Sequence, residues 1–128
     1  MTTSETEIIA RRYVAAVGAH DLAPLDDLLD DALTARFAGD ASSKDEWVRA
    51  LGRLLPALLR NEIRDVFTVD GRACVVYDFV TDTPAGSVTC VELLTIQNGR
   101  IREIDLLLDR VAFAPVNAAL AERAAATT

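Results

Sequence analysis

The second half of the chain has the pattern of a β-meander, and this pattern constrains the fold more than any other feature of the sequence. From Glu62 onward the residues alternate and are rich in β-branched and aromatic types, which predicts strands over residues 63–70, 72–82, 87–97 and 100–109. Asp70-Gly71 and Asn98-Gly99 are typical of tight hairpin turns. In Thr83-Pro84-Ala85-Gly86, proline suits the first central position of a type I turn, and glycine suits the left-handed residue that follows.

The register of the hairpin around Pro84 decides which side chains share a face. A three-residue loop with a bulge would place Asp78 opposite Glu92. Their face would also carry Cys74, Val76, Val80, Val88, Cys90, Leu94 and Ile96. Two carboxylates facing each other on an apolar face destabilise a sheet, so a protein that keeps them there is expected to use them. The two cysteines would lie three residue pairs apart, beyond disulfide reach.

A two-residue loop would instead pair Tyr77 with Glu92 and move Asp78 to the other face. Glu92 is the firmer observation, because its neighbours at two-residue spacing are all apolar. We therefore expect Glu92 to face inward in either register. Burial there would raise its pKa, and an opposing Asp78 would raise it further.

The turn at Asn98-Gly99 leaves a similar choice. A two-residue turn would set Glu92 opposite Asp105, whereas a three-residue bulged loop would set it opposite Ile104 and direct Leu106 and Leu108 inward. Repulsion between like charges favours the second register, which places Asp105 outside. Asp109 is then expected at the surface or at a dimer interface.

The first half of the chain has the signals of helices. Ser4-x-x-Glu7 and Ser43-x-x-Glu46 are capping boxes, and Pro56 is expected to bend or end the second helix. Those two helices carry inward-facing stripes at Ile9, Tyr13 and Val17, and at Trp47, Leu51, Leu54, Leu55 and Leu58. A short helix over 22–29, a short strand over 33–37 and a helix or loose tail over 115–125 are also predicted. Helices followed by a meander indicate one α+β domain over residues 1–128, with the helices on one face of a curved sheet.

Charge and composition exclude several classes of function. A net charge of -7 and a pI near 4.6 argue against binding to nucleic acid or to an anionic membrane surface. The start of the chain lacks the regions of a signal peptide and no apolar run could span a bilayer, so a cytoplasmic protein is expected. One histidine, two cysteines and no glycine-rich phosphate loop indicate no metal and no cofactor. The outer face of the sheet, expected to carry Val75, Phe79, Val91 and Leu93, is too apolar for water and predicts a homodimer.

Three segments resemble a known superfamily: Ala-His-Asp-Leu at 19–22, Leu-Asp-Asp-Ala at 29–32, and Gly-Arg-Ile-Arg-Glu-Ile at 99–104 ending in Asp109. With the order of elements, they resemble the nuclear transport factor 2-like folds, and most nearly the SnoaL-like polyketide cyclases and the ketosteroid isomerases. The resemblance implies a cone-shaped, mostly antiparallel sheet with N-terminal helices on its concave face, a deep apolar pocket and a homodimer through the sheet. It does not fix the reaction, because this fold hosts isomerases, cyclases, epoxide hydrolases, dehydratases and non-catalytic proteins.

The catalytic residues of these families carry over only in part. Tyr13 stands where ketosteroid isomerases place the tyrosine of the oxyanion hole, and Glu92 where they place a protonated acid. Arg36 or a neighbour occupies the position of their general base. In the limonene epoxide hydrolase pattern the second carboxylate would fall at Leu106 and the arginine near Asp78. The histidine–aspartate pair of the SnoaL-like cyclases is not reproduced, since the sole His20 lies at a helix end.

The sequence therefore predicts a small cofactor-free acid/base enzyme, an isomerase, cyclase or hydrolase, that acts on an apolar metabolite. Asp78 and Glu92 are the predicted acid and base, and Tyr13 is the predicted polarising group, with Tyr77 as a weaker candidate for that role. The predicted substrate contacts are Arg36, Trp47, Val76, Leu94 and Leu106. The alternative is a non-catalytic binding or dimerisation module. An open cavity that reaches Glu92 favours the enzyme, and a cone filled by side chains favours the module.

Overall fold

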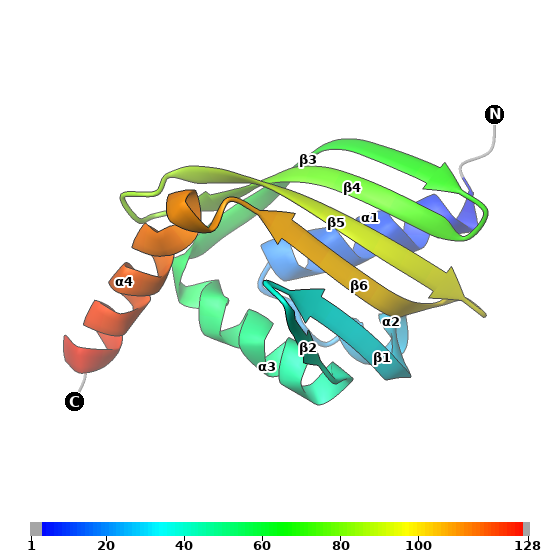
Figure 1. Cartoon of the computed structure of the whole chain (residues 1–128), viewed down its shortest axis with the longest axis horizontal. Helices are drawn as coiled ribbons and strands as arrows, with labels where there is room; N and C mark the ends of the chain where they lie inside the picture. The colour runs from blue at the N-terminus through cyan, green and yellow to red at the C-terminus, as the bar shows by residue number, and fades with distance from the viewer. Residues whose placement is uncertain (1–3, 127–128) are drawn as a thin grey trace.

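A computed structural model describes residues 4–126 as a curved sheet with its helices gathered on one side (Figure 1). The elements follow one another along the chain as α1 (Glu5–Gly18), α2 (Leu25–Leu28), β1 (Leu29–Phe37), β2 (Asp40–Ser42), α3 (Lys44–Leu54), the 3-10 turn η1 (Leu55–Ala57), β3 (Leu58–Val69), β4 (Arg72–Thr81), β5 (Ser87–Gln97), β6 (Arg100–Leu108) and α4 (Arg110–Ala126). The predicted α+β class, with N-terminal helices on the concave face, is confirmed.

The six strands are ordered β2-β1-β6-β5-β4-β3, and all neighbours are antiparallel except β1 and β6. Figure 1 shows the sheet arching over α1, with α3 on the same side and α4 projecting beyond the end of β6. The core lies between the concave face and α1, where Tyr13, Val14, Val75 and Leu94 are almost completely buried. No helix among residues 4–126 is long and apolar enough to cross a membrane.

Local capping signals account for where the helices begin. The Ser4 hydroxyl accepts a hydrogen bond from the Glu7 amide, and Ser43 and Glu46 form a complete capping box at the start of α3. Pro56 ends α3 as predicted, since Leu54 is its last residue and a short 3-10 turn follows. The helix expected over 22–29 is only Leu25–Leu28, because Leu29 already pairs with β6.

The hairpin between β4 and β5 differs from both predicted registers. Asp78 pairs with Thr89, and Val75 lies opposite Glu92, so the two carboxylates do not face each other. The predicted type I turn is present, with Gly86 at φ 62° and its amide bound to the Thr83 carbonyl. The strands nevertheless separate three residues earlier than expected.

Contacts of Asp82 with distant parts of the chain explain this early separation. The Asp82 amide donates to the Ala57 carbonyl of η1, and its carboxylate accepts from Arg123 of α4 at 2.7 Å. Asp82 is therefore drawn out of the ladder, and the loop widens from Thr81 to Gly86, whose main chains are still hydrogen-bonded.

Compared with the register expected for a three-residue bulged loop, the observed register turns each side chain of β4 to the opposite face of the sheet. Its concave-face residues are Ala73, Val75, Tyr77, Phe79 and Thr81, all buried, and the partly exposed outer residues are Cys74, Val76, Asp78 and Val80. The predicted placement of Val75 and Phe79 on the outer face is therefore wrong. Cys74 and Cys90 lie on opposite faces, and both are free thiols.

The hairpin between β5 and β6 combines a tight turn with a bulge, a combination that neither predicted register contains. Gln97 pairs with Arg100 across a two-residue turn, and a bulge after the next pair shifts the register so that Glu92 faces Leu106. Neither predicted partner, Asp105 or Ile104, lies opposite Glu92. The predicted faces are nevertheless confirmed: Leu106 and Leu108 point inward, and Asp105 lies outside near Arg36.

The last helix is longer than the range predicted from sequence. Asp109 is exposed, as expected, and its carboxylate accepts hydrogen bonds from the amides of Val111 and Ala112. It therefore caps α4, which begins at Arg110 rather than near Pro115.

Candidate functional site

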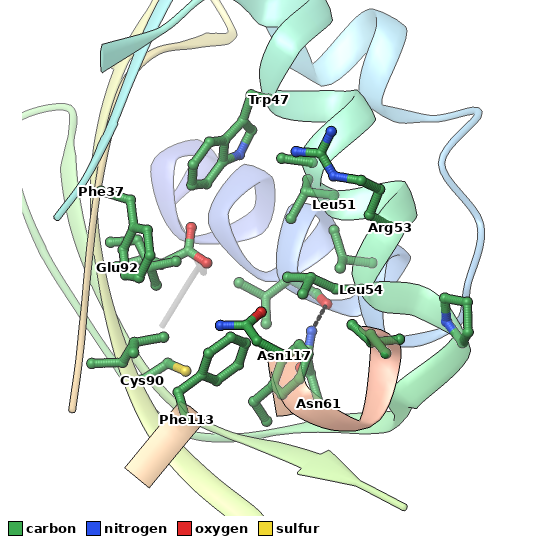
Figure 2. Close-up of a pocket in the computed structure, with 18 of the residues that line it drawn as sticks. Phe37, Trp47, Leu51, Arg53, Leu54, Asn61, Cys90, Glu92, Phe113 and Asn117 are labelled. Atoms are coloured by element: carbon green, nitrogen blue, oxygen red, sulfur yellow. Dashed lines mark hydrogen bonds between the residues drawn. The ribbon is translucent and has the colours of Figure 1, made fainter. Parts of the chain in front are cut away.

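A cavity of about 700 Å³ lies between the concave face of the sheet and helices α1, α3 and α4. Most of its lining is apolar, with Phe37, Phe79, Phe113, Leu106 and Leu108 on its sheet and α4 sides. The cone is therefore open rather than filled. Figure 2 shows the side chain of Glu92 entering this space from β5, with Trp47, Cys90 and Asn117 around it.

Glu92 is the one acidic residue among those that line this pocket, and it is only 3% exposed. The Tyr77 hydroxyl donates a hydrogen bond to its Oε1 at 2.5 Å. Its Oε2 is buried and has no hydrogen-bond partner within residues 4–126. Burial raises the pKa of Glu92 to about 7, even though the hydroxyls of Tyr77 and Tyr13 favour the charged form. Both protonation states are thus populated at neutral pH.

The two tyrosines near Glu92 remain neutral hydrogen-bond donors. Burial, followed by the charge of Glu92, raises the pKa of Tyr13 and the pKa of Tyr77 well above the usual value of a phenol. The indole Nε1 of Trp47 donates to the Tyr13 hydroxyl oxygen at 2.9 Å, which leaves the Tyr13 proton to interact with the Glu92 carboxylate. The site thus brings together a carboxyl group and two phenols from three different elements.

Other polar side chains of the pocket come from β3, α3 and α4. Asn61 and Asn117 line it, and so do Arg53 and Arg123. Arg123 is engaged with Asp82 and donates to the Pro56 carbonyl at 3.1 Å. Burial and the charge of Glu92 raise the pKa of the Cys90 thiol to about 12, so this thiol is protonated and is a poor nucleophile.

Four of the predicted site residues meet at the pocket, and four do not. Tyr13, Trp47, Glu92 and Leu106 line it. Leu94 is on the concave face but is completely buried away from the pocket lining. The remaining three, Asp78, Arg36 and Val76, lie on the outer face.

Asp78 and Arg36 are engaged in ion pairs on the outer face. Asp78 accepts hydrogen bonds from Arg64 and Thr89, each at 3.0 Å. Arg36 pairs with Glu103 at 3.0 Å and with Asp105 at 3.5 Å. The pairing of Asp78 with Glu92 inside the cone is therefore wrong, because the widened loop moves Asp78 to the other side of the sheet.

Two pocket residues, Asn61 and Asn117, were not singled out from the sequence. Asn61 precedes the strand predicted from residue 63. Leu58, which was predicted to belong to the stripe of the preceding helix, is instead the first residue of β3, because the helix ends before Pro56. Asn117 falls in a segment that was expected as a helix or a loose tail, and it lies in the middle of α4. Within residues 4–126, no three acidic, histidine or cysteine side chains gather in a way that could hold a metal ion.

Comparisons with known proteins agree with this architecture. The family model of the SnoaL-like domain matches residues 10–104. No curated protein sequence matches the chain. A steroid delta-isomerase from Pseudomonas aeruginosa is similar in structure, with a TM-score of 0.75, 13% identity, and coverage of 98% of this chain and 95% of that one.

Two further solved structures show how widely the fold is shared. An NTF2-like protein of unknown function from Mesorhizobium loti has a TM-score of 0.69 and 22% identity, and the match covers 85% of this chain and 97% of that one. A de novo designed protein with a curved β-sheet has a TM-score of 0.72 and 17% identity, with 92% and 99% covered. At these identities, the likeness to solved structures concerns the fold alone.

Proposed function

Because this chain belongs to the family of SnoaL-like domains, we propose that it is a cofactor-free acid/base enzyme acting on an apolar small molecule in the pocket beneath its sheet. The observation that carries this proposal is the unpartnered Oε2 of Glu92 in a mostly apolar cavity of about 700 Å³. An open cavity of this kind favours an enzyme over a module whose cone is filled.

Glu92 has the properties of a group that takes up a proton and gives it back. Tyr77 holds Oε1 by a hydrogen bond, so Oε2 is the oxygen left for the substrate. A carboxyl group with a pKa of about 7 is present as base and as acid in comparable amounts at neutral pH. One carboxyl group can then remove a proton from the substrate and return it at another position, as an isomerase or a cyclase requires.

No second carboxylate enters the proposed mechanism. Asp78 lies on the outer face, and at the β1 position where a ketosteroid isomerase would have its general base, Arg36 points outward while its neighbour Phe37 lines the pocket. The steroid delta-isomerase from Pseudomonas aeruginosa shares only its fold with this chain. It therefore supports proton transfer as the class of reaction through that shared fold and not through matching catalytic residues. A hydrolase would need Glu92 to activate a water molecule within the same pocket.

A model substrate for proton abstraction tests Glu92 as the proposed base without knowledge of the natural substrate. In 5-nitrobenzisoxazole, a base removes the C3 proton and the N–O bond breaks, which yields a coloured cyanophenolate. We expect catalysis by the wild type that rises with pH around the pKa of Glu92 and that is lost in Glu92→Gln. The matched control is Asp78→Asn, which removes an acid on the outer face and should keep the activity. Equal rates for the wild type and Glu92→Gln would contradict the proposed role.

We also propose that the outer face of the sheet forms a homodimer. Leu107, Val91 and Val76 are consecutive partners across three strands on this face, and Leu93, Cys74 and Phe67 form a second row beside them. Phe67 is 60% exposed and Leu107 is 54% exposed. Apolar side chains gathered in this way on one face are typical of a surface covered by a partner.

A further inference from the structure

The pocket holds a second buried acceptor, which the proposed proton transfer does not use. Asn61 lies on β3, lines the pocket, and donates from its Nδ2 to the Val14 carbonyl of α1 at 3.0 Å (Figure 2). Its Oδ1 is buried and has no hydrogen-bond partner in the part of the chain that the structure describes. A buried carbonyl oxygen without a partner is unfavourable, and native structures rarely keep one without a reason.

The orientation of the Asn61 amide is fixed by its surroundings. In the flipped orientation Oδ1 would face the Val14 carbonyl oxygen, and two acceptors would repel each other. The backbone of Asn61 is equally constrained, because a Cβ atom at Gly18 of α1 would lie 2.7 Å from the backbone nitrogen of Asn61. Helix α1 and strand β3 therefore touch at this point, and Asn61 holds its Oδ1 in one place.

The unsatisfied acceptor of Asn61 restricts the chemistry of a ligand. Among the described residues, two buried side-chain polar atoms lack a hydrogen-bond partner, Asn61 Oδ1 and Glu92 Oε2, and both belong to residues that line the same cavity. The carboxyl group of Glu92 accepts when ionised and donates when protonated, whereas Asn61 Oδ1 can only accept. A ligand that presents only carbonyl or ether oxygens would therefore leave Asn61 Oδ1 unsatisfied, and a ligand with an O–H group would complete it.

From this match we propose that Asn61 Oδ1 anchors a hydroxyl group of the substrate, so that the pocket selects apolar alcohols, phenols or enols. This inference rests on the proposed function, because it names the class of molecule for the same pocket. A neutral hydroxyl fits better than an ammonium group, because most of the lining is apolar and Arg53 lies at the cavity and would repel a cation. Asn61 is then a residue that determines substrate specificity, and Glu92 Oε2 remains the proton-transfer atom.

The single tryptophan of the chain gives a direct binding signal, since Trp47 lines the pocket. The probes are 4-cyclohexylcyclohexanol and its methyl ether, which share an apolar body and differ in one O–H donor. The variants are Asn61→Leu and, as the control, Asp78→Asn on the outer face. For each protein we take the ratio of the dissociation constant of the alcohol to that of the ether. The probes differ in hydration by the same amount in every measurement, so this difference cancels when the ratio of a variant is compared with that of the wild type.

We expect Asn61→Leu to weaken binding of the alcohol about fivefold, the equivalent of one neutral hydrogen bond, and to leave the methyl ether bound as tightly as before. Asp78→Asn should change neither constant. If Asn61→Leu does not fold, the ¹³Cγ resonance of Asn61 in the wild type provides the test. It should shift when the alcohol binds and stay in place with the ether.

The two possible failures are distinguishable. An unchanged ratio in Asn61→Leu, or equal ¹³Cγ shifts with both probes, would overturn the anchoring role of Asn61 and leave the acid/base pocket intact. Absence of binding by both probes to the wild type would count against the proposed apolar substrate pocket itself.

Discussion

Tyr77 reaches Glu92 diagonally across the sheet: its direct partner on β5 is Cys90, two residues earlier, and its hydroxyl donates to Oε1 of Glu92 at 2.5 Å. Diagonal neighbours on one face of an antiparallel pair lie within reach of an aromatic side chain. The register expected from a three-residue bulged loop would have put Tyr77 on the opposite face from Glu92. The three-residue difference between the expected and observed pairing thus replaces a second carboxylate near Glu92 with a phenol.

The stability of the protein should depend on the charge of Glu92. Its folded-state pKa of about 7 lies above the unfolded value, so its stabilising contribution is complete at low pH and is lost as pH rises through 7. Glu92→Gln does not titrate, so the stability of this variant relative to the wild type should increase by about 2 kcal/mol between pH 5 and pH 8. Urea unfolding of both proteins at several pH values measures this difference. A variant that is less stable than the wild type at pH 8 would indicate a structural glutamate held by a partner.

Removing the Tyr77 hydroxyl should shift the pH dependence of activity. This hydroxyl lowers the pKa of Glu92 by donating to it, so Tyr77→Phe should raise that pKa above about 7. The midpoint of the pH–rate profile with 5-nitrobenzisoxazole should move to higher pH, and the rate at pH 7 should fall while the plateau at high pH remains. A lower plateau with an unchanged midpoint would assign Tyr77 a different role.

Charges on the outer face should dissociate the proposed dimer. We expect wild-type protein at micromolar concentration to sediment at twice the 13.8 kDa of one chain, and Val91→Glu together with Leu107→Glu to sediment as a monomer. Val111→Glu is the matched control, because Val111 is 84% exposed but lies on α4. A wild type that is strictly monomeric would remove the dimer proposal.

Two helical glycines should respond in opposite ways to alanine. At Gly18 a Cβ atom would lie 2.7 Å from the Asn61 backbone nitrogen, so Gly18→Ala must separate α1 from β3 and should cost about 1–3 kcal/mol. At Gly52 the nearest atom would be the end of Leu22 at 3.8 Å, so Gly52→Ala should be neutral or should stabilise α3 by up to ~1 kcal/mol. Thermal unfolding of both variants checks the pair, and equal effects would contradict the close approach at Gly18.

The elements of the fold were predictable because their signals are local. Ser4 and Ser43 cap helices through residues three positions away, and Asp70-Gly71 turns the chain within two residues. The inward orientation of Glu92 followed from the simple alternation of β5. These features depend on nearest neighbours in the sequence, and the structure confirms them.

The composition of the pocket was less predictable because it depends on contacts between distant segments. Both faces of β4 carry apolar residues, so alternation alone did not fix its register, and the deciding contacts of Asp82 are with Ala57 and Arg123. Asp78 was consequently assigned to the wrong face. Asn61 gains its importance from Val14 and Gly18 of α1, a relationship that a single sequence does not display.

The anchoring of Asp82 also separates the tip of the β4–β5 hairpin from its ladder. Because η1 and α4 hold the loop at its base, residues added next to the exposed Pro84 would lengthen the tip without sliding one strand past the other. The alignment of Tyr77 with Glu92 is then insulated from changes in loop length. Insertions at the tip of this hairpin could therefore add new surface to the protein while the proposed proton-transfer site keeps its geometry.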